Sequence, residues 1–443
     1  MNLISLPGGS LHGTAALPGD KSLSHRAALF AALAEGDSRI ENFLVSGVTQ
    51  AMLDALVVLG VPYELEGTTL TVHGRGLGGL HSPQRPINCG NSATTIRLLA
   101  GALAMAGVPA VLDGSAGLRR RPMGRIVDPL QAMGVEIAAA AGCAPLTLGR
   151  SPRPLRPLDY DLPVASAQIK TCLLLAALAA GSPTTLREPG PSRDHTERML
   201  RSQGIAVSSE KLVQDGRTLY VTRLTPPYTL AFKPLALSLP GDFSSAAFLI
   251  VAALVTPGSS IVLRSVGLNP ARTGLLDALL AMGGDICITN PATRSGEPVG
   301  DLEVKASRLH ATQVGGEQVV RMIDEFPIFA VAAAYSEGVT TVRDAAELRL
   351  KESDRIAGLC SELRALGAAA EERPDGFSIT GGDLPGGAAV DPHGDHRLAM
   401  SLAVAGLAAV KPVSVSGAEI VDESFPEFIP VLQALGARLE QAA

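Results

Sequence analysis

The chain has 443 residues, of which 46% are hydrophobic and 18% charged, and its formal net charge is −6. This acidic balance, with ten Phe, five Tyr and no Trp, argues against nucleic-acid binding, which uses a basic surface and stacked aromatic rings. At roughly 150 residues per domain, the length by itself suggests three domains.

The five cysteines form no CxxC pair, which is typical of a protein from a reducing compartment. The first residues lack the basic and apolar regions of a signal peptide. The longest apolar runs are far shorter than the roughly 18 residues that cross a bilayer. We therefore expect a cytoplasmic protein with no membrane partner.

One pattern recurs six times along the chain. A small or polar segment leads into an apolar helix at Ser22, Ser92, Ser166, Ser244, Asp324 and Asp395. A strand-like stretch follows each helix, at residues 38–40, 110–112, 184–186, 260–263, 340–342 and 413–415. A second, amphipathic helix then ends at Gly60, Gly134, Gly204, Gly283, Gly367 and Gly436.

These glycines recur about every 75 residues, and the halves of the chain also match each other. Leu17-Pro18-Gly19-Asp20 returns as Leu239-Pro240-Gly241-Asp242. We therefore predict six α/β units in two similar lobes, with sheets outside buried apolar helices. If the helices of a lobe start at the same end, their free N–H groups form an anion site.

The residues at these helix entrances carry charge. Cations occur at Lys21, Arg26, Arg125, Arg193, Lys351, Arg355 and Arg397, and few carboxylates are expected beside them. Such segregation suits small polyanionic substrates. Lys21 does not belong to a Walker A loop, because Asp20 separates it from Gly19.

Asp324 and Glu352 are the carboxylates placed for acid–base chemistry. Residues 349–355 are predicted to start a helix, which would put Glu352 and Arg355 on one helical face. A capped helix with surface ion pairs is the simpler explanation of each entrance taken alone. His393 and His396 could instead ligate a metal, but a closed set of four zinc ligands is absent from that segment. His25 and His195 are expected to be structural.

Taken together, several strings resemble the EPSP synthase family over essentially the full length. These are residues 18–26 (PGDKSLSHR), 90–94 (GNSAT), 121–125 (RPMGR), 166–168 (SAQ), 193–197 (RDHTE), 350–355 (LKESDR) and 395–397 (DHR). The resemblance implies an inside-out α/β barrel fold with two lobes of three βαβαββ repeats. Residues 21–231 would form the first lobe, which mainly binds shikimate 3-phosphate. Residues 1–20 and 232–443 would form the second, with the catalytic carboxylates and much of the phosphoenolpyruvate site.

The resemblance also implies the reaction, in which phosphoenolpyruvate and shikimate 3-phosphate give 5-enolpyruvylshikimate 3-phosphate and phosphate in aromatic amino-acid biosynthesis. Shikimate 3-phosphate would be held by Lys21, Ser22, Arg26, Ser166, Ala167, Gln168, Arg193, Asp324 and Lys351. Phosphoenolpyruvate would be held by Lys21, Ala93, Arg125, Gln168, Arg355 and Arg397. Asp324 would accept the 5-hydroxyl proton, and Glu352 would protonate the methylene carbon, with Lys21 as a competing donor. We expect a monomer with no cofactor and no metal.

Two positions depart from the usual family pattern. Val48 stands where an Asp is common, which leaves a detail of the phosphoenolpyruvate side open. Ala93 stands where herbicide-sensitive members have Gly, and the strings around it resemble the glyphosate-tolerant class. The added methyl group would narrow the pocket, so weak glyphosate binding is expected.

Three alternatives share parts of this pattern. UDP-N-acetylglucosamine enolpyruvyl transferases have the same repeat plan, but they typically carry Lys-Asn at Lys21-Ser22 and a cysteine in the loop matching residues 118–125, where this chain has none. The second alternative is a non-catalytic anion-binding protein, which would not need Asp324 and Glu352. The third is a metal hydrolase centred on His393 and His396.

Overall fold

The computed structural model describes residues 1–214 and 216–442, which fold into two compact units. Unit 1 comprises residues 1–18, 240–293 and 298–443, and unit 2 comprises residues 19–239 and 294–297. The chain thus passes from one unit to the other immediately after Pro18 and again before Pro240, within the two copies of the repeated segment.

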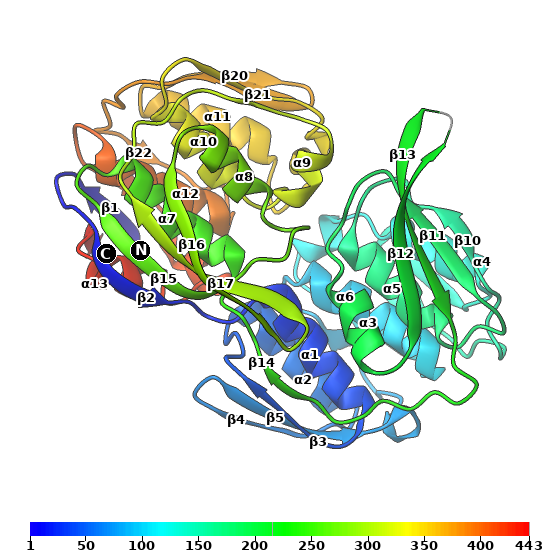
Figure 1. Cartoon of the computed structure of the whole chain (residues 1–443). Helices are drawn as coiled ribbons and strands as arrows, with labels where there is room; N and C mark the ends of the chain where they lie inside the picture. Colours follow the sequence, from blue (N-terminus) through cyan, green and yellow to red (C-terminus); the bar gives the residue numbers. More distant parts are fainter. Residues whose placement is uncertain (215, 443) are drawn as a thin grey trace. The chain divides into compact units, whose positions relative to one another are not determined.

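Over its described residues, unit 2 contains three pairs of α-helices and three sheets (Figure 1). The helices are α1 (Lys21–Leu33), α2 (Gly47–Val58), α3 (Ala93–Ala106), α4 (Gly124–Ala132), α5 (Ala167–Ala177) and α6 (His195–Ser202). The strands are β3 (Glu35–Glu41), β4 (Tyr63–Glu66), β5 (Thr69–Arg75), β6 (Ile87–Asn88), β7 (Ala110–Asp113), β8 (Ile137–Ala140), β9 (Cys143–Leu148), β10 (Asp159–Asp161), β11 (Thr184–Glu188), β12 (Ala206–Gln214), β13 (Arg217–Thr225) and β14 (Ala236–Ser238).

Unit 1 repeats this organisation with one additional short helix. The helices are α7 (Phe243–Val255), α8 (Gly274–Ala281), α9 (Glu317–Arg321), α10 (Phe326–Ala334), α11 (Arg355–Ala365), α12 (His396–Ala408) and α13 (Phe428–Ala434). The strands are β1 (Asn2–Leu6), β2 (His12–Ala16), β15 (Ser260–Gly267), β16 (Asp285–Arg294), β17 (Glu297–Lys305), β18 (Gln313–Val314), β19 (Val339–Val342), β20 (Ala369–Arg373), β21 (Gly376–Thr380), β22 (Ala389–Val390), β23 (Val413–Val415) and β24 (Arg438–Ala442). The turn at residues 294–297, between β16 and β17, groups with unit 2.

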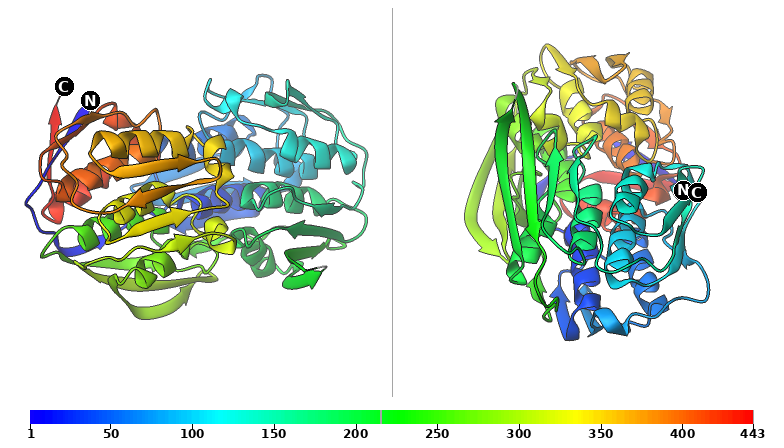
Figure 2. Two further views of the ribbon diagram at one scale, coloured as in Figure 1. Left: turned by 90° about the horizontal axis from the view of Figure 1, so that it is seen from above. Right: turned by 90° about the vertical axis from the view of Figure 1, so that its right-hand side faces the viewer.

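Over the described residues the strands form six four-stranded sheets, three to a unit. Unit 2 has the orders β14-β3-β5-β4, β6-β7-β9-β8 and β10-β11-β13-β12. Unit 1 has β16-β17-β15-β2, β18-β19-β21-β20 and β22-β23-β1-β24. Within each unit the sheets lie outside a set of central helices (Figures 1 and 2). The predicted α/β class with three repeats per unit is confirmed.

The central helices are buried because their sequences are apolar or small on every side. All of α7 from Phe243 to Leu254 is buried, as are twelve of the thirteen residues of α1. Helices α3 and α5 pack so closely that a Cβ atom at Gly101 would lie 2.2 Å from the carbonyl oxygen of Cys172. Glycine at this position therefore sets the spacing between the two helices.

The six glycines predicted to end the second helices all have positive φ angles, between 81° at Gly204 and 107° at Gly436. All six of these helices end two residues before their glycine, as α2 does before Gly60. A left-handed residue after a helix favours glycine, so the terminators are confirmed.

The predicted helix starts need small corrections. Ser92, Ser166 and Asp395 are N-caps, but Asp20 and Asp242, not Ser22 and Ser244, cap α1 and α7. A carboxylate is as good a cap as a hydroxyl, and each pair lies two residues apart in sequence. Lys21 is consequently the first residue of α1 and does not precede it.

The six repeats are also less continuous than the sequence pattern predicted. β2 leads into α1 in sequence but pairs in parallel with β15, next to α7. β14 leads into α7 but pairs in parallel with β3, next to α1. The two equivalent entry strands are therefore exchanged, and β1 likewise completes the sheet of β23 and β24. Strand pairing across such long sequence separations leaves no local signal.

Candidate active site

In unit 1, the starts of three helices are held together by charged side chains. Asp395 caps α12, and its Oδ1 accepts from the backbone N–H of Arg397 at 2.9 Å. Arg355, the first residue of α11, donates from Nε to Asp395 Oδ2 at 2.7 Å. Arg397 Nη1 donates to the backbone oxygen of Asp324, just before α10, at 3.1 Å. The starts of α10, α11 and α12 thus meet at one place.

Arg355 is the centre of this cluster and is only 1% exposed. Its Nη2 donates to Glu352 Oε2 at 2.7 Å, and its Nη1 lies 3.7 Å from Asp324 Oδ1. Nη1 makes no hydrogen bond to any described residue. A buried guanidinium with one nitrogen that makes no hydrogen bond to the described residues can bind an anion in addition to its carboxylate partners.

The charges of Arg355 and Asp395 stabilise each other. Burial acts to raise the pKa of Asp395, but the adjacent Arg355 guanidinium outweighs it and lowers that pKa below its usual value. Burial acts to lower the pKa of Arg355, and Asp395 and Glu352 together raise it above its usual value. Both groups are therefore ionised, and they form a buried ion pair beneath the rest of the cluster.

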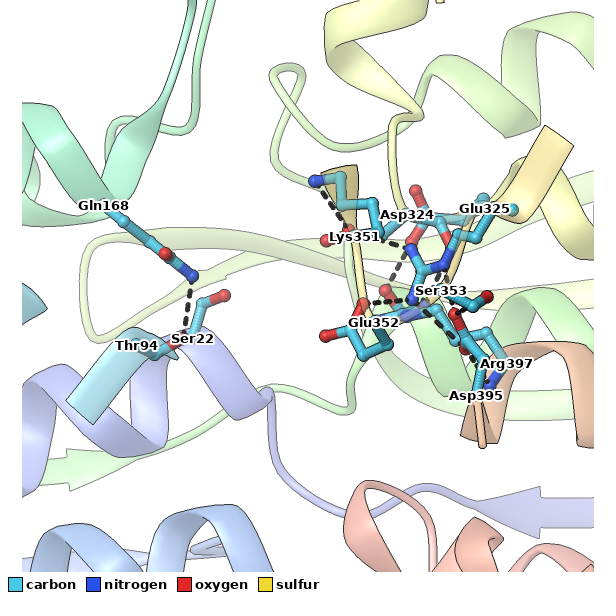
Figure 3. A network of polar contacts seen from close by, with 12 residues as sticks. Ser22, Thr94, Gln168, Asp324, Glu325, Lys351, Glu352, Ser353, Asp395 and Arg397 are labelled. Carbon is cyan, nitrogen blue, oxygen red and sulfur yellow. Dashed lines mark hydrogen bonds and ion pairs between the residues drawn. The ribbon is translucent and has the colours of Figure 1, made fainter. Parts of the chain in front are cut away.

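Three partly exposed side chains lie around this buried pair (Figure 3). Asp324 is 19% exposed, Glu352 20% and Lys351 27%, and Lys351 Nζ lies 3.6 Å from Asp324 Oδ1. This arrangement can exchange protons at two carboxylates while three nearby cations hold an anion.

One prediction about this segment was wrong. Residues 351–353 form bends that follow a 3₁₀ helix, and α11 begins only at Arg355, with Asp354 as its N-cap. The ion pair of Glu352 with Arg355 is present, but Glu352 extends from a loop and not from a helical face. The Asp354 cap fixes where the helix starts, because Oδ1 accepts from the N–H of Ala357 at 3.0 Å.

Unit 1 also contains a buried polar group that the sequence reasoning missed. Glu325 is 1% exposed, accepts from the Ser244 hydroxyl, and lies 3.8 Å from Arg397 Nη1. Arg272 Nη2 donates to Ser244 Oγ at 2.6 Å and to Asp242 Oδ1 at 3.1 Å. This network joins the start of α7 to Arg397. The repeat of Asp20-Lys21-Ser22 as Asp242-Phe243-Ser244 was the available signal.

In unit 2, Arg26 joins three helices. It is 2% exposed and donates to Ser22 O at 3.0 Å, to Thr171 Oγ1 at 2.8 Å and to Thr196 Oγ1 at 2.8 Å. A longer bond of 3.4 Å reaches the carbonyl oxygen of Ala167. Burial lowers the pKa of Arg26 to about 10, opposed by Glu197, so the side chain remains a cation near neutral pH.

Gln168 connects α5 to α3. Its Oε1 accepts from Arg97 Nη1 at 2.7 Å, and its Nε2 donates to Thr94 Oγ1 at 2.9 Å (Figure 3). Arg97 Nη2 also donates to the carbonyl oxygen of Pro122 at 3.1 Å. Arg97 and Thr94 therefore fix the Gln168 amide, a role that the sequence reasoning did not assign to them.

The remaining predicted residues of unit 2 lie at or near helix starts. Arg193 Nη1 donates to Ser22 Oγ at 3.2 Å, and the backbone N–H of Ser166 donates to Glu188 Oε1 at 3.0 Å. Ala93 and Ala167 are the first residues of α3 and α5, and Arg125 lies in the first turn of α4. Ser22, Ala93 and Ala167 thus lie at the starts of α1, α3 and α5, whereas Arg125 lies on α4 and Arg193 precedes α6.

The expectation of few carboxylates beside the cations was wrong for unit 1. There Lys351, Arg355 and Arg397 share their cluster with Asp324, Glu325, Glu352 and Asp395. Buried cations need nearby anions to offset the cost of removing them from water. Charge counting along the sequence could not reveal this pairing, since the partners come from separate segments.

Three of the histidines singled out in the sequence have protein partners close to a ring nitrogen. His25 is fully buried, with Nδ1 2.8 Å from Lys21 O and Nε2 3.1 Å from Val48 O, in agreement with a structural role. His195 Nδ1 lies 2.8 Å from the buried carboxylate of Glu297. His393 Nε2 lies 2.9 Å from Glu362 Oε1.

Across residues 1–214 and 216–442, no helix is both long enough and apolar enough to cross a bilayer.

Comparison with known proteins adds independent evidence. The family model described as EPSP synthase (3-phosphoshikimate 1-carboxyvinyltransferase) matches residues 6–432. A 3-phosphoshikimate 1-carboxyvinyltransferase from Salinibacter ruber is 48% identical, over 95% of this chain and 96% of its own length. The enzyme of that name from Citrifermentans bemidjiense is 44% identical, over 98% of each chain.

Solved structures agree with the fold. The EPSP synthase of Acinetobacter baumannii superimposes with a TM-score of 0.85 at 38% identity, over 99% of this chain and 100% of that one. The enolpyruvyl transferase NikO of Streptomyces tendae has a TM-score of 0.75 at 19% identity, over 100% of this chain and 98% of that one, which supports the fold alone. The activity is that of a 3-phosphoshikimate 1-carboxyvinyltransferase, an enzyme of the shikimate pathway. With its two units of three α/β repeats and family match across nearly the whole chain, this protein belongs to the EPSP synthase family.

Proposed function

We propose that the clusters of the two units divide the work of the enolpyruvyl transfer. Shikimate 3-phosphate binds mainly to the helix starts of unit 2, and unit 1 supplies the catalytic carboxylates together with Arg355 and Arg397 for phosphoenolpyruvate. The residues assigned to shikimate 3-phosphate are Lys21, Ser22, Arg26, Ser166, Ala167, Gln168, Arg193, Asp324 and Lys351. Those assigned to phosphoenolpyruvate are Lys21, Ala93, Arg125, Gln168, Arg355 and Arg397.

The chemistry follows from the two partly exposed carboxylates of unit 1. Asp324 takes the proton of the 5-hydroxyl group as that oxygen forms a bond to C2 of phosphoenolpyruvate. Glu352, or in competition Lys21, gives a proton to the methylene carbon, which becomes a methyl group. The result is a tetrahedral ketal phosphate. Loss of a methyl proton with cleavage of the C2–O bond to phosphate then forms the enolpyruvyl product.

One observation carries this assignment most directly. Asp324, Lys351 and Glu352 remain partly exposed while the Arg355–Asp395 pair beneath them is buried. Partly exposed carboxylates can exchange protons with a substrate, and buried charges cannot reorient when charge develops. A fixed, buried ion pair with partly exposed reactive side chains above it is suited to stabilising an intermediate more than either substrate.

Three further properties belong to this proposal. Glyphosate binds weakly because the methyl group of Ala93, at the start of α3, narrows the phosphoenolpyruvate pocket. The protein acts as a monomer in the cytoplasm. It uses neither a cofactor nor a metal. Its arginines and lysines supply the positive charge that metal ions supply to phosphate groups in other enzymes.

A phosphate-release assay on the purified protein tests the proposal. Phosphate should appear from phosphoenolpyruvate only when shikimate 3-phosphate is present, and a chelator should leave the rate unchanged. Release that needs no shikimate 3-phosphate would contradict the proposed reaction, and loss of activity with chelator would contradict the metal-free chemistry. A glyphosate series in the same assay measures how weakly the inhibitor binds.

A further inference from the structure

Unit 2 contains a buried lysine that the proposed chemistry does not use. Lys170 lies on α5, one turn after Ser166, and its side chain is 4% exposed. Its Nζ lies 2.8 Å from Glu188 Oε2 and 2.8 Å from Glu197 Oε1, and each glutamate side chain is 1% exposed. Glu188 ends β11, and Glu197 lies in the first turn of α6. Three elements therefore meet at one ammonium group.

The three groups are mutually dependent. Burial acts to lower the pKa of Lys170, but the two carboxylates outweigh it and raise that pKa above its usual value. The lysine is therefore charged, and it offsets two glutamates that would otherwise repel each other. Buried ion clusters seldom stabilise a fold more than apolar residues of the same volume would. Their presence is better explained by the positions that they impose.

The cluster fixes two backbone segments, one at the start of α5 and one between β11 and α6. Glu188 Oε1 accepts from the backbone N–H of Ser166 at 3.0 Å, just before Ala167 and Gln168. Lys170 Nζ donates to the carbonyl oxygen of Ser192 at 3.3 Å, just before Arg193. The segments that carry the proposed shikimate 3-phosphate ligands are thus both tied to this one lysine.

We propose that Lys170, with Glu188 and Glu197, is a positioning residue that sets the separation between the Ser166–Gln168 segment and Arg193 for binding of shikimate 3-phosphate. The proposal rests on the proposed function of unit 2. Lys170 is too deeply buried to touch the substrate, so it acts through the backbone of Ser166 and Ser192. The phosphoenolpyruvate cations of unit 1 lie outside this network.

The first test is Lys170→Met, which preserves much of the side-chain length and removes the charge. The two carboxylates then repel each other, and the loop before Arg193 moves. Because displacements of about 1 Å can cost on the order of a hundredfold in rate, we expect the KM and the calorimetric Kd for shikimate 3-phosphate to rise about tenfold or more. The KM for phosphoenolpyruvate should rise less, because Gln168 is the one of its proposed ligands that lies in the displaced segments, whereas Arg355 and Arg397 belong to unit 1.

A second variant separates positioning from stability. Lys170→Met/Glu188→Gln has the same net charge in the cluster as the wild type, so its Tm should recover relative to Lys170→Met. Its weakened shikimate 3-phosphate binding should persist, because the tie to Ser192 is still missing. Recovery of binding together with Tm would overturn the proposal. If Lys170→Met does not fold, shikimate 3-phosphate binding is measured on the double variant alone.

Leu146→Ala is the matched control in the same unit. Leu146 is fully buried on β9, in a different sheet, and its truncation costs about 2–5 kcal/mol without touching the cluster. Its Kd for shikimate 3-phosphate should stay within twofold or so of wild type. An increase equal to that of Lys170→Met would overturn the proposal.

Wild-type protein that binds shikimate 3-phosphate without turnover would refute the proposed reaction but leave the binding test decisive. Wild-type protein that does not bind it would refute both.

Discussion

Arg355 and Asp395 form an ion pair of 2.7 Å in which the arginine side chain is 1% exposed and the aspartate side chain is fully buried. Asp395 simultaneously caps α12, and Arg355 is the first residue of α11. One carboxylate therefore orients an arginine proposed to bind phosphoenolpyruvate and starts the helix that carries a second, Arg397. The binding geometry of unit 1 depends on this carboxylate.

Asp395→Asn separates these two functions. Asparagine caps a helix about as well as aspartate, so α12 should still form. Removing the charge leaves Arg355 with one fewer buried partner, which costs about 3–5 kcal/mol when a buried pair is broken. We expect a lower Tm and a KM for phosphoenolpyruvate raised about tenfold or more.

Asp354→Asn is the matched control, because Asp354 caps α11 by the same kind of bond but is 40% exposed. It should lower Tm only slightly and leave the KM for phosphoenolpyruvate near its wild-type value. Equal effects of the two variants would contradict a special role for the buried pair.

Glu352→Gln tests the proton donor. The amide fills the same space at a position 20% exposed, so folding should be retained. General acid catalysis contributes about 10²–10⁴-fold, and we expect kcat to fall by a factor in that range. If Glu352→Gln turns over at the wild-type rate, the donor is another group, and Lys21→Met becomes the variant to measure.

Ala93→Gly tests the basis of glyphosate discrimination. Removing the methyl group at the start of α3 widens the space beside the proposed phosphoenolpyruvate site, so glyphosate should inhibit the variant at lower concentration. A single methylene or methyl group is worth about 1–3 kcal/mol in a pocket, which predicts a drop of at least roughly tenfold in the inhibition constant. The idea is wrong if both proteins have the same inhibition constant.

His25 makes stability depend on pH. Burial lowers its pKa to about 4, whereas an unfolded histidine titrates near pH 6.5 or so. Between these values the unfolded state binds more protons, so the free energy of unfolding falls as pH decreases from about 6.5 to 4. We expect His25 to account for about 2 kcal/mol of the loss between pH 7 and pH 5.

Urea unfolding of wild type and His25→Asn at these two pH values measures the effect, which should largely vanish in the variant. His73→Gln is the control of opposite sign. A hydrogen bond to Asp37 raises the pKa of the partly exposed His73, so its stabilisation is present at low pH and lost as pH rises. Removing His73 should therefore increase the gain in stability from pH 5 to pH 7. A slope unchanged in His25→Asn would contradict burial of a neutral imidazole.

Local signals in the sequence predicted much of the fold. The helix-ending glycines could be located because a left-handed backbone has a strong residue preference, and the apolar helices because their burial requires it. The exchange of β2 and β14 could not be predicted, because Pro18-Gly19-Asp20 and Pro240-Gly241-Asp242 have nearly the same local sequence. Only tertiary pairing distinguishes the two strands.

The candidate site was predictable to a similar degree. Glu352 and Arg355 were expected to interact from their spacing, although the loop geometry that brings them together was not foreseen. Lys170 was not identified from the sequence, since its partners Glu188 and Glu197 lie on other elements. A lysine within an apolar helix was the signal that could have identified it.

The most direct test of the central claim follows both substrates by ³¹P NMR in a single reaction with the purified wild-type protein. The phosphoenolpyruvate signal should decrease while inorganic phosphate increases by the same amount, and the phosphate ester of shikimate should persist as a shifted signal of the enolpyruvyl product. The signals should not change when shikimate 3-phosphate is omitted. Phosphate formed without that substrate, or shikimate 3-phosphate losing its own phosphate, would contradict enolpyruvyl transfer as the reaction of this protein.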